Sequence, residues 1–185
     1  MNEFPVLQTK RLILRAFKMN DAPVVQFLAG DFAIADTTST IPHPYPNGAA
    51  EDWISTHETD LLMDRGIDWA IARRQDSCLI GAITIRIKEN EKAEIGYWIG
   101  KPYWGQGYCS EAAQEVLEYG FLVKGLNRIY AFHFSRNPAS GRVMQKIGMN
   151  QEGILRHHEK RWGKYEDLVV YGILRTEFNQ INSTN

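Results

Sequence analysis

The sequence has 185 residues and a formal net charge of −1, with 44% hydrophobic and 23% charged residues. This length suits one well-cored domain, and the near-neutral charge gives no sign of a nucleic-acid or anionic-membrane partner. No apolar run reaches the ~20 residues that a membrane span needs, and no secretory leader pattern opens the sequence. The two cysteines suit neither a disulfide framework nor a zinc site. We therefore expect a cytoplasmic protein without a bound metal.

Strand and helix patterns alternate along the chain, and no linker divides them. Their order predicts a meander of strands, then two strand–helix crossovers and two last strands, which form a mixed α/β sheet flanked by helices on both faces. In chain order the predicted elements are a strand at residues 11–15, a short helix after Asp21, a loop at 30–47, a helix at 50–62, strands at 69–72, 79–87 and 93–99, a helix at about 110–123, a strand at 128–134, a helix at 138–147 and a strand pair around Gly163.

The segment 95–112 has the pattern of an apolar strand, a glycine-containing turn and the start of a helix. Backbone N–H groups at a helix N-terminus, with the positive end of the helix dipole, form a site that suits phosphate. Gly105 and Gly107 fit this role because a residue without a Cβ lets a pyrophosphate approach the backbone closely. Turns with two glycines are common, so this pattern alone does not define a site.

A second strand–helix junction follows, with Asn137 at the predicted strand exit and Ser140 in the first turn of the next helix. Two successive junctions in a mixed sheet bring their strand ends side by side. Ligands of open α/β sheets favour the crevice at such a place. The two junctions together therefore predict a binding site between them.

Short motifs around both junctions form one combination. They are Tyr103-Trp104-Gly105-Gln106-Gly107-Tyr108 with Glu111-Ala112, then Asn137-x-x-Ser140 and Lys146-x-Gly148, together with residues 9–15 near the start and 163–167 near the end. This combination resembles the GNAT acetyltransferases, and among them the RimJ/RimL-type enzymes that acetylate protein N-termini. The resemblance covers residues from about 6 to 176. Pro102 departs from it, because the family usually has Gln or Arg at that position.

The resemblance implies acetyl-CoA as cofactor and one GNAT domain over residues 1–178, followed by a polar C-terminal tail at 179–185. It also implies a mixed, mostly antiparallel central sheet of about six to seven strands. The implied cofactor-binding residues are Tyr97, Trp98 and Ile99 in the strand that pairs with the pantetheine arm, Gly105, Gln106, Gly107 and Tyr108 in the turn whose amides bind the pyrophosphate, and Trp104, Ser110, Asn137 and Ser140 nearby. Asn137 would hydrogen-bond the arm, and Ser140 would lie near the sulfur.

The implied reaction needs a base and a proton donor, because an amine attacks the thioester carbonyl directly. An α-amino group has a pKa near ~8 and a lysine side chain one near ~10.4, so a protein N-terminus is the easier acceptor to deprotonate. A ribosomal protein is one such acceptor. Glu94 and Glu159 are the candidate bases, with Glu94 slightly favoured, and Ser140 is the candidate donor to the leaving thiolate.

Two alternatives stay open. The acceptor could instead be a small amine such as a polyamine, an aminoglycoside or an amino acid, because the segments 30–47 and 155–166 that would choose it carry no decisive pattern. The chain could also be a non-catalytic acyl-CoA-binding domain that keeps the glycine turn. The sequence does not decide between a monomer and a homodimer.

Overall fold

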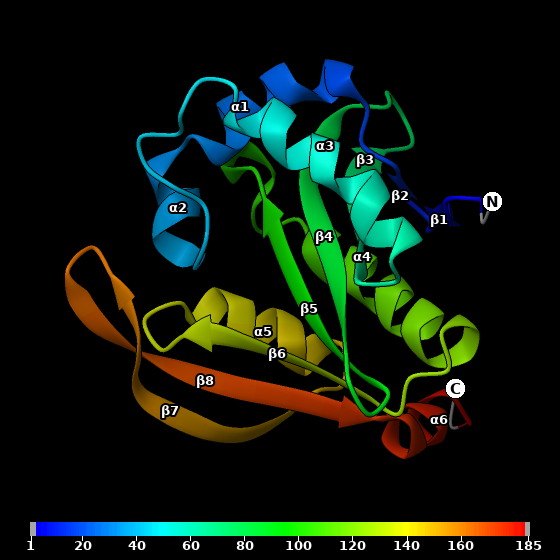
Figure 1. Cartoon of the computed structure of the whole chain (residues 1–185). Coiled ribbons are helices and arrows are strands. Elements are labelled where there is room, and N and C mark those ends of the chain that lie inside the picture. Colours follow the sequence, from blue (N-terminus) through cyan, green and yellow to red (C-terminus); the bar gives the residue numbers. More distant parts are fainter. Residues whose placement is uncertain (1–2, 184–185) are drawn as a thin grey trace.

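The computed structural model describes residues 3–183 of the chain. Within them the strands form one open sheet in the order β1-β2-β3-β4-β5-β6-β8-β7 (Figure 1). The strands are β1 (Leu7–Gln8), β2 (Leu12–Arg15), β3 (Gly66–Arg73), β4 (Leu79–Lys88), β5 (Lys92–Ile99), β6 (Arg128–Phe134), β7 (Asn150–Arg161) and β8 (Lys164–Leu174). The helices are α1 (Ala22–Ala29), α2 (Phe32–Thr37), α3 (Ala49–Leu62), α4 (Tyr108–Glu118), α5 (Pro138–Lys146) and α6 (Arg175–Ser183), with short helical turns at Met19–Asp21, Lys101–Tyr103 and Tyr119–Val123.

The strand pairing confirms the predicted mixed, mostly antiparallel sheet. Neighbouring strands are antiparallel except β5 and β6, which run parallel. The described part of the chain has eight strands, more than expected, because Leu7–Gln8 forms a two-residue strand beside β2.

The parallel pair is joined at one end only. Lys92–Glu94 of β5 lie beside Arg128–Tyr130 of β6, and beyond these residues the two strands diverge. Figure 1 shows the result, in which β1–β5 with α1–α3 form one arm and β6–β8 with α5 form the other. The second half of β5 therefore has a neighbour, β4, along one edge and no strand along the other.

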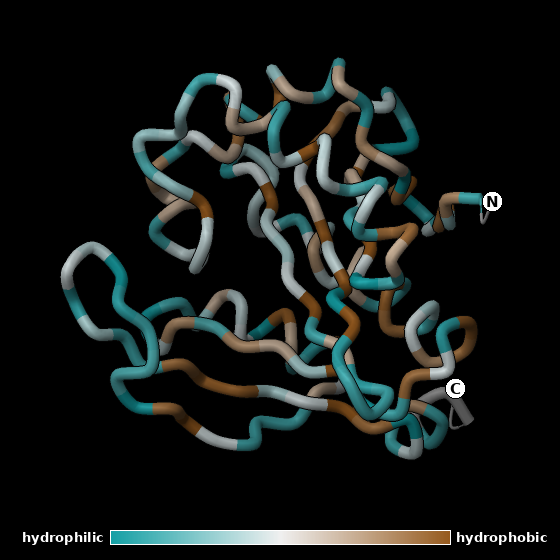
Figure 2. The backbone as a smooth tube through the Cα atoms, in the orientation of Figure 1, coloured by the Kyte–Doolittle hydropathy of each residue, from teal (hydrophilic) through white to brown (hydrophobic). Residues whose placement is uncertain are grey.

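Helices cover both faces of the sheet, as predicted, because its strands carry apolar side chains on both. Side chains alternate between the faces along a strand. In β5, Ala93 and Ile95 join the core under α4, where Val116 and Leu117 are buried. Trp98 packs on the opposite face, against the smaller core under α1 and α3. Figure 2 shows brown, hydrophobic stretches along the central strands and teal, hydrophilic turns between them.

The prediction that residues 30–47 are a loop is wrong in part. α2 begins there behind Asp31, whose carboxylate accepts the N–H of Ala33 at 2.8 Å, and the helix buries Ile34 and Ala35. A side-chain cap and two buried residues stabilise this short helix, although it is too short to show a clear period in the sequence.

The boundary predicted after residue 178 falls inside a helix. α6 continues to Ser183, and Phe178 is buried in the main core. The last two residues of the predicted tail, 184 and 185, lie outside the described part of the chain. No helix within residues 3–183 has both the length and the apolar character that crossing a membrane requires.

Candidate active site

Two pockets lie between the arms of the sheet. The larger, about 530 Å³, is lined by β3–β6, α1, α3 and the segment 37–42, and we call it the sheet pocket. The smaller, about 350 Å³, is lined by the end of β5, the glycine turn and the first turns of α4 and α5, and we call it the turn pocket. The residues that line both are Thr37, Thr38, Tyr97, Trp98 and Ser140. A ligand in one pocket would meet a ligand in the other at these residues.

The glycine turn has the conformation that its two glycines allow. Gly105 has a φ of 74° and Gly107 a φ of 79°, both in the left-handed region that other residues rarely adopt. Gly107 is also the N-cap of α4, so the free N–H groups of that helix begin here. A Cβ on Gly105 would meet no atom within 4 Å, and one on Gly107 would meet only Arg11 at 3.5 Å. Open space therefore lies beside a helix N-terminus.

Hydrogen bonds from the N-terminal strand hold this turn in place. Glu111 in the first turn of α4 accepts the Thr9 hydroxyl at 2.6 Å, the Arg11 backbone N–H at 2.8 Å and the Arg11 Nε at 2.6 Å. Burial alone would raise the pKa of Glu111, but these hydrogen bonds outweigh it and lower that pKa. Arg11 also donates to the Gln106 carbonyl at 3.0 Å and lies over the ring of Tyr108. The motif that contains Thr9 and Arg11 was part of the resemblance, but no role was assigned to these residues.

Ser140 and Tyr97 form a pair of hydroxyl groups where the pockets join. Their oxygen atoms are 3.1 Å apart, within hydrogen-bond distance, and the Tyr97 hydroxyl donates its one proton to the Ser140 carbonyl at 3.2 Å. Burial raises the pKa of Tyr97, so its hydroxyl keeps its proton at neutral pH. Asn137 caps α5 by accepting the Ser140 N–H at 3.4 Å. Only the backbone of Tyr97 was assigned a role from the sequence, because its side-chain contact depends on how α5 packs against β5.

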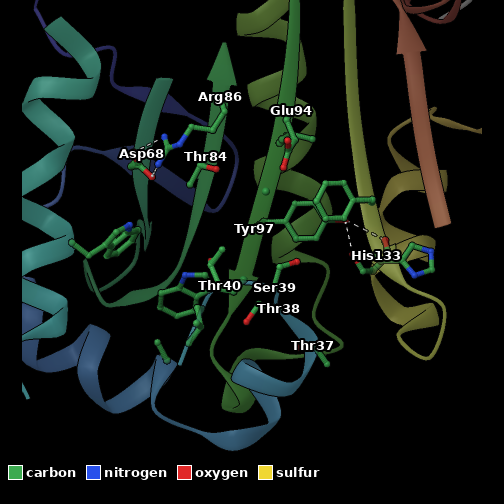
Figure 3. A pocket seen from close by; sticks show the side chains of 18 of the residues that line it. Thr37, Thr38, Ser39, Thr40, Asp68, Thr84, Arg86, Glu94, Tyr97 and His133 are labelled. Atoms are coloured by element: carbon green, nitrogen blue, oxygen red, sulfur yellow. Dashed lines mark hydrogen bonds and ion pairs between the residues drawn. The ribbon is translucent and has the colours of Figure 1, made fainter. Parts of the chain in front are cut away.

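The structure brings Glu94 to the pockets but not Glu159. Glu94 lines the sheet pocket (Figure 3). Its carboxylate accepts the Tyr130 hydroxyl at 3.3 Å. Glu159 lies on β7 opposite Glu166 of β8, and it lines neither pocket. Of the two candidate bases, only Glu94 therefore shares a pocket with Ser140.

Most of the predicted cofactor residues line the turn pocket, and they are Tyr97, Trp98, Ile99, Trp104, Gly105, Gly107, Tyr108, Ser110, Asn137 and Ser140. Gln106 does not, because its side chain turns back to donate to the Pro102 carbonyl at 3.2 Å. The pocket also contains two cationic side chains that were not assigned from the sequence, Arg142 and Lys146 of α5. They add positive charge where an anionic ligand would lie.

The segment 37–42, which we call the roof, is tied to the distant hairpin of β7 and β8. Arg161 donates to the carbonyls of Ala35 at 2.6 Å, Ser39 at 3.2 Å and Ile41. The indole N–H of the neighbouring Trp162 donates to Asp36 at 3.0 Å. The hairpin therefore holds the roof over the place where the two pockets join.

Comparison with known proteins identifies the family. The sequence profile of the acetyltransferase (GNAT) domain matches residues 11–150. The chain belongs to the GNAT family and is an N-acetyltransferase that depends on acetyl-CoA. It is 36% identical over 179 residues to the uncharacterized N-acetyltransferase YoaA of Bacillus subtilis (strain 168), a match that covers 93% of this chain and 98% of that one.

Two further proteins are similar to this chain. The ribosomal-protein-serine acetyltransferase of Escherichia coli (strain K12) is 34% identical over 113 residues, which cover 60% of this chain and 63% of that one. The solved structure of spermidine N-acetyltransferase from Vibrio cholerae, in complex with CoA and spermine, has the same fold. It matches with a TM-score of 0.80 and 21% identity, over 92% of this chain and 99% of that one.

Proposed function

We propose that this chain transfers the acetyl group of acetyl-CoA to the α-amino group of a protein N-terminus. The observation that carries the proposal is the meeting of the two pockets at Tyr97 and Ser140. A cofactor in the turn pocket and an amine in the sheet pocket would bring their reacting groups together there. Such positioning is the largest requirement of a direct transfer.

The turn pocket fits the chemistry of CoA. The backbone amides from Gly105 to Tyr108, at the N-terminus of α4, would bind the pyrophosphate, since the space beside Gly105 is open and only the Arg11 guanidinium lies near Gly107. The edge of β5 beyond Glu94, which has no strand beside it, would bind the pantetheine arm. Ser140 would then lie near the sulfur, and Asn137 beside the arm.

Three side chains would assist the proton transfers of the reaction. When bound, acetyl-CoA supplies a thioester carbonyl that an amine attacks directly, so that the C–N bond forms, the C–S bond breaks and the CoA thiolate leaves. Glu94 would take the proton that the amine loses, through a water molecule. Ser140 would donate a hydrogen bond to the leaving thiolate, which then takes its proton from solvent, and Tyr97, which stays protonated, would orient the Ser140 hydroxyl through their shared hydrogen bond.

A protein N-terminus is supported over other acceptors by two points. The α-amino group has a pKa near ~8, below the ~10.4 of a lysine side chain, so a carboxylate base deprotonates it more easily. The similar Escherichia coli enzyme is named for acetylating a ribosomal protein. The alternative is a small amine such as a polyamine, because the carboxylate of Glu94 in the sheet pocket would attract any ammonium group.

The test combines a binding measurement with a transfer assay. Calorimetric titration with acetyl-CoA should give micromolar binding, and dephospho-CoA and NAD serve as comparison ligands. Release of the CoA thiol is then measured with a peptide that has a free N-terminus, with the same peptide blocked at its N-terminus but carrying a lysine, and with spermidine. Transfer to the free N-terminus is expected to be fastest. Faster transfer to spermidine would replace the proposed acceptor with a polyamine.

The two carboxylates are separated by matched variants. Glu94→Gln is expected to lower kcat by about 10²- to 10⁴-fold, the range for loss of a general base, with acetyl-CoA affinity unchanged. Glu159→Gln is the control and should keep full activity. If Glu159→Gln lost activity and Glu94→Gln did not, the base assignment would be reversed. Ser140→Ala should also lower kcat without weakening acetyl-CoA binding.

A further inference from the structure

The floor of the sheet pocket contains a fixed guanidinium that the reaction above does not use. Arg86 of β4 donates from both Nη atoms to the two carboxylate oxygens of Asp68 of β3, at 2.7 and 2.8 Å (Figure 3). The Asp68 side chain is fully buried, whereas that of Arg86 is 31% exposed, and both residues line the pocket. The ion pair therefore joins a fully buried carboxylate to a side chain that stays partly exposed in the pocket.

The chain leaves room for this arrangement. Gly66 lies opposite Arg86 in the register of β3 and β4. A Cβ on Gly66 would come within 2.9 Å of both Cδ and Nη1 of Arg86. The missing side chain lets Arg86 lie across β3 and reach Asp68. Replacing a buried ion pair with apolar residues is often neutral or stabilising, so stability alone is a weak reason for such a pair.

We infer that Arg86 binds a peptide carbonyl oxygen of the acceptor, and that it selects peptides over amines that lack such an oxygen. A guanidinium has five N–H groups, and Asp68 occupies two of them. Within the described residues the structure gives Arg86 no other hydrogen-bond partner. The inference rests on the proposed function, since it concerns the acceptor of that reaction.

The charges around Arg86 favour a neutral oxygen over a second carboxylate. Asp68 already balances the positive charge of the guanidinium, and Glu94 lies directly opposite Arg86 in the register of β4 and β5. An acceptor carboxylate would meet two negative groups here. A carbonyl oxygen accepts the same hydrogen bonds without that repulsion.

The distance from the guanidinium to the reaction centre suits a short stretch of peptide. Asp68, Thr84 and Gly96 lie side by side across β3, β4 and β5. Neighbouring strands are about 4.8 Å apart, so the backbone of Asp68, which holds the guanidinium, lies two spacings or about 10 Å from the backbone of Gly96. An extended peptide advances about 3.3 Å per residue. The carbonyl of the second or third residue would therefore reach Arg86, and Gly96 has no side chain to obstruct it.

The first test compares two acceptors in the transfer assay. With tri-alanine amide, Arg86→Met is expected to lower kcat/KM by about 10- to 100-fold, mainly through KM, which is the range for a lost hydrogen bond to a charged group. With spermidine the same variant should lose nothing. Arg65→Met is the control, because Arg65 undergoes the same chemical change, is 61% exposed and lines neither pocket. An equal loss with both acceptors, or no loss with tri-alanine amide, would overturn the inference.

A second variant guards against misfolding. Arg86→Met leaves the Asp68 carboxylate buried without a partner, which is destabilising. The double variant Asp68→Asn with Arg86→Met removes both charges, and the same contrast between the two acceptors is expected of it. Arg86→Lys keeps the charge but loses the fork of donors, so it should recover only part of the activity with tri-alanine amide.

A binding measurement separates this inference from the proposed function. The Nε–H signal of Arg86, assigned by its loss in Arg86→Lys, is followed by NMR in the complex with CoA. It should shift when tri-alanine amide is added and stay in place with spermidine. If the Arg86 signal shifts but the protein transfers acetyl to no peptide, the binding role of Arg86 is supported and the proposed function is rejected. Transfer to tri-alanine amide without any shift would reject the role of Arg86.

Discussion

Two glycines in the same conformation allow the cofactor turn to be tested against a matched control. Gly107, the N-cap of α4, has φ 79° and ψ 2°, and Gly48, the N-cap of α3, has φ 83° and ψ −13°. The alanine Cβ would meet only Arg11, at 3.5 Å, on the first and nothing within 4 Å on the second. Alanine at either position therefore lowers the free energy of unfolding mainly because it must adopt the left-handed backbone conformation, which costs about 1–2 kcal/mol.

The two variants should differ in cofactor binding alone. Each is expected to lower the unfolding temperature by ~2–4 °C for each kcal/mol lost. Gly107 lines the turn pocket and Gly48 does not. A methyl group on Gly107 would hold a pyrophosphate away from the amides, and each hydrogen bond to a charged group is worth about 1.5–3 kcal/mol. Loss of one such bond weakens acetyl-CoA binding by about 10- to 100-fold, since 1.4 kcal/mol is tenfold.

The assay is thermal unfolding without ligand, followed by calorimetric titration with acetyl-CoA. Equal affinity in the two variants and the wild type would refute the assignment of the phosphate to this turn. Weaker binding in Gly48→Ala as well would show that backbone strain, and not contact with the cofactor, causes the loss.

Two further predictions concern hydrogen bonds that hold the glycine turn and the roof in place. The hydrogen bonds from Thr9 and Arg11 lower the pKa of Glu111, so their stabilisation is present above its usual pKa of about 4.3 and is lost as the pH falls through the lowered value. Glu111→Gln should therefore unfold at a lower temperature than the wild type at pH 7, and this difference should shrink below about pH 4. A difference in unfolding temperature that does not change with pH would contradict this prediction. Arg161→Ala should raise the acceptor KM by about tenfold through a displaced roof, with a smaller loss of acetyl-CoA affinity, because only Thr37 and Thr38 of the roof line the turn pocket. Lys160→Ala removes a neighbouring exposed cation and should change neither quantity. An equal effect of the two variants would rule out the roof contacts.

Helices and strands with a regular spacing of hydrophobic residues could be predicted from the sequence. Contacts between elements far apart in the sequence could not. The strand 93–99 and the glycine turn after it have local patterns that the structure confirms as β5 and the start of α4. α2 has no comparable pattern, because it is held partly by the Asp31 cap and partly by Arg161, more than a hundred residues away. No local pattern can show a contact of that kind.

The choice between Glu94 and Glu159 shows the same limit. Both are carboxylates in predicted strand or turn segments, and the sequence favours Glu94 only slightly, because strand alternation places it on the same face as Trp98. Glu94 lies at the point where β5 and β6 stop pairing, so it stands at the edge of the space that opens between them. Glu159 lies beyond an irregularity in the pairing of β7 with β8, and it lines neither pocket. The divergence of β5 from β6 is a property of the whole sheet, and it distinguishes Glu94 from Glu159.

That divergence also explains why one fold can hold two ligands that must react. Had β5 and β6 paired along their full length, backbone hydrogen bonds to β6 would occupy the whole edge of β5. Because pairing ends at Glu94, the strand leaves an edge for one ligand, while the side chains on its α1 and α3 face, from Glu94 to Trp98, line the pocket for the other. The two ligands then share a single strand as their boundary. If the proposed function holds, Asp68, Thr84 and Arg86 of β3 and β4 would contact the acceptor alone, because they line only the sheet pocket, whereas the roof residues Thr37 and Thr38 line both pockets. Changes at β3 and β4 would then alter acceptor preference without disturbing cofactor binding.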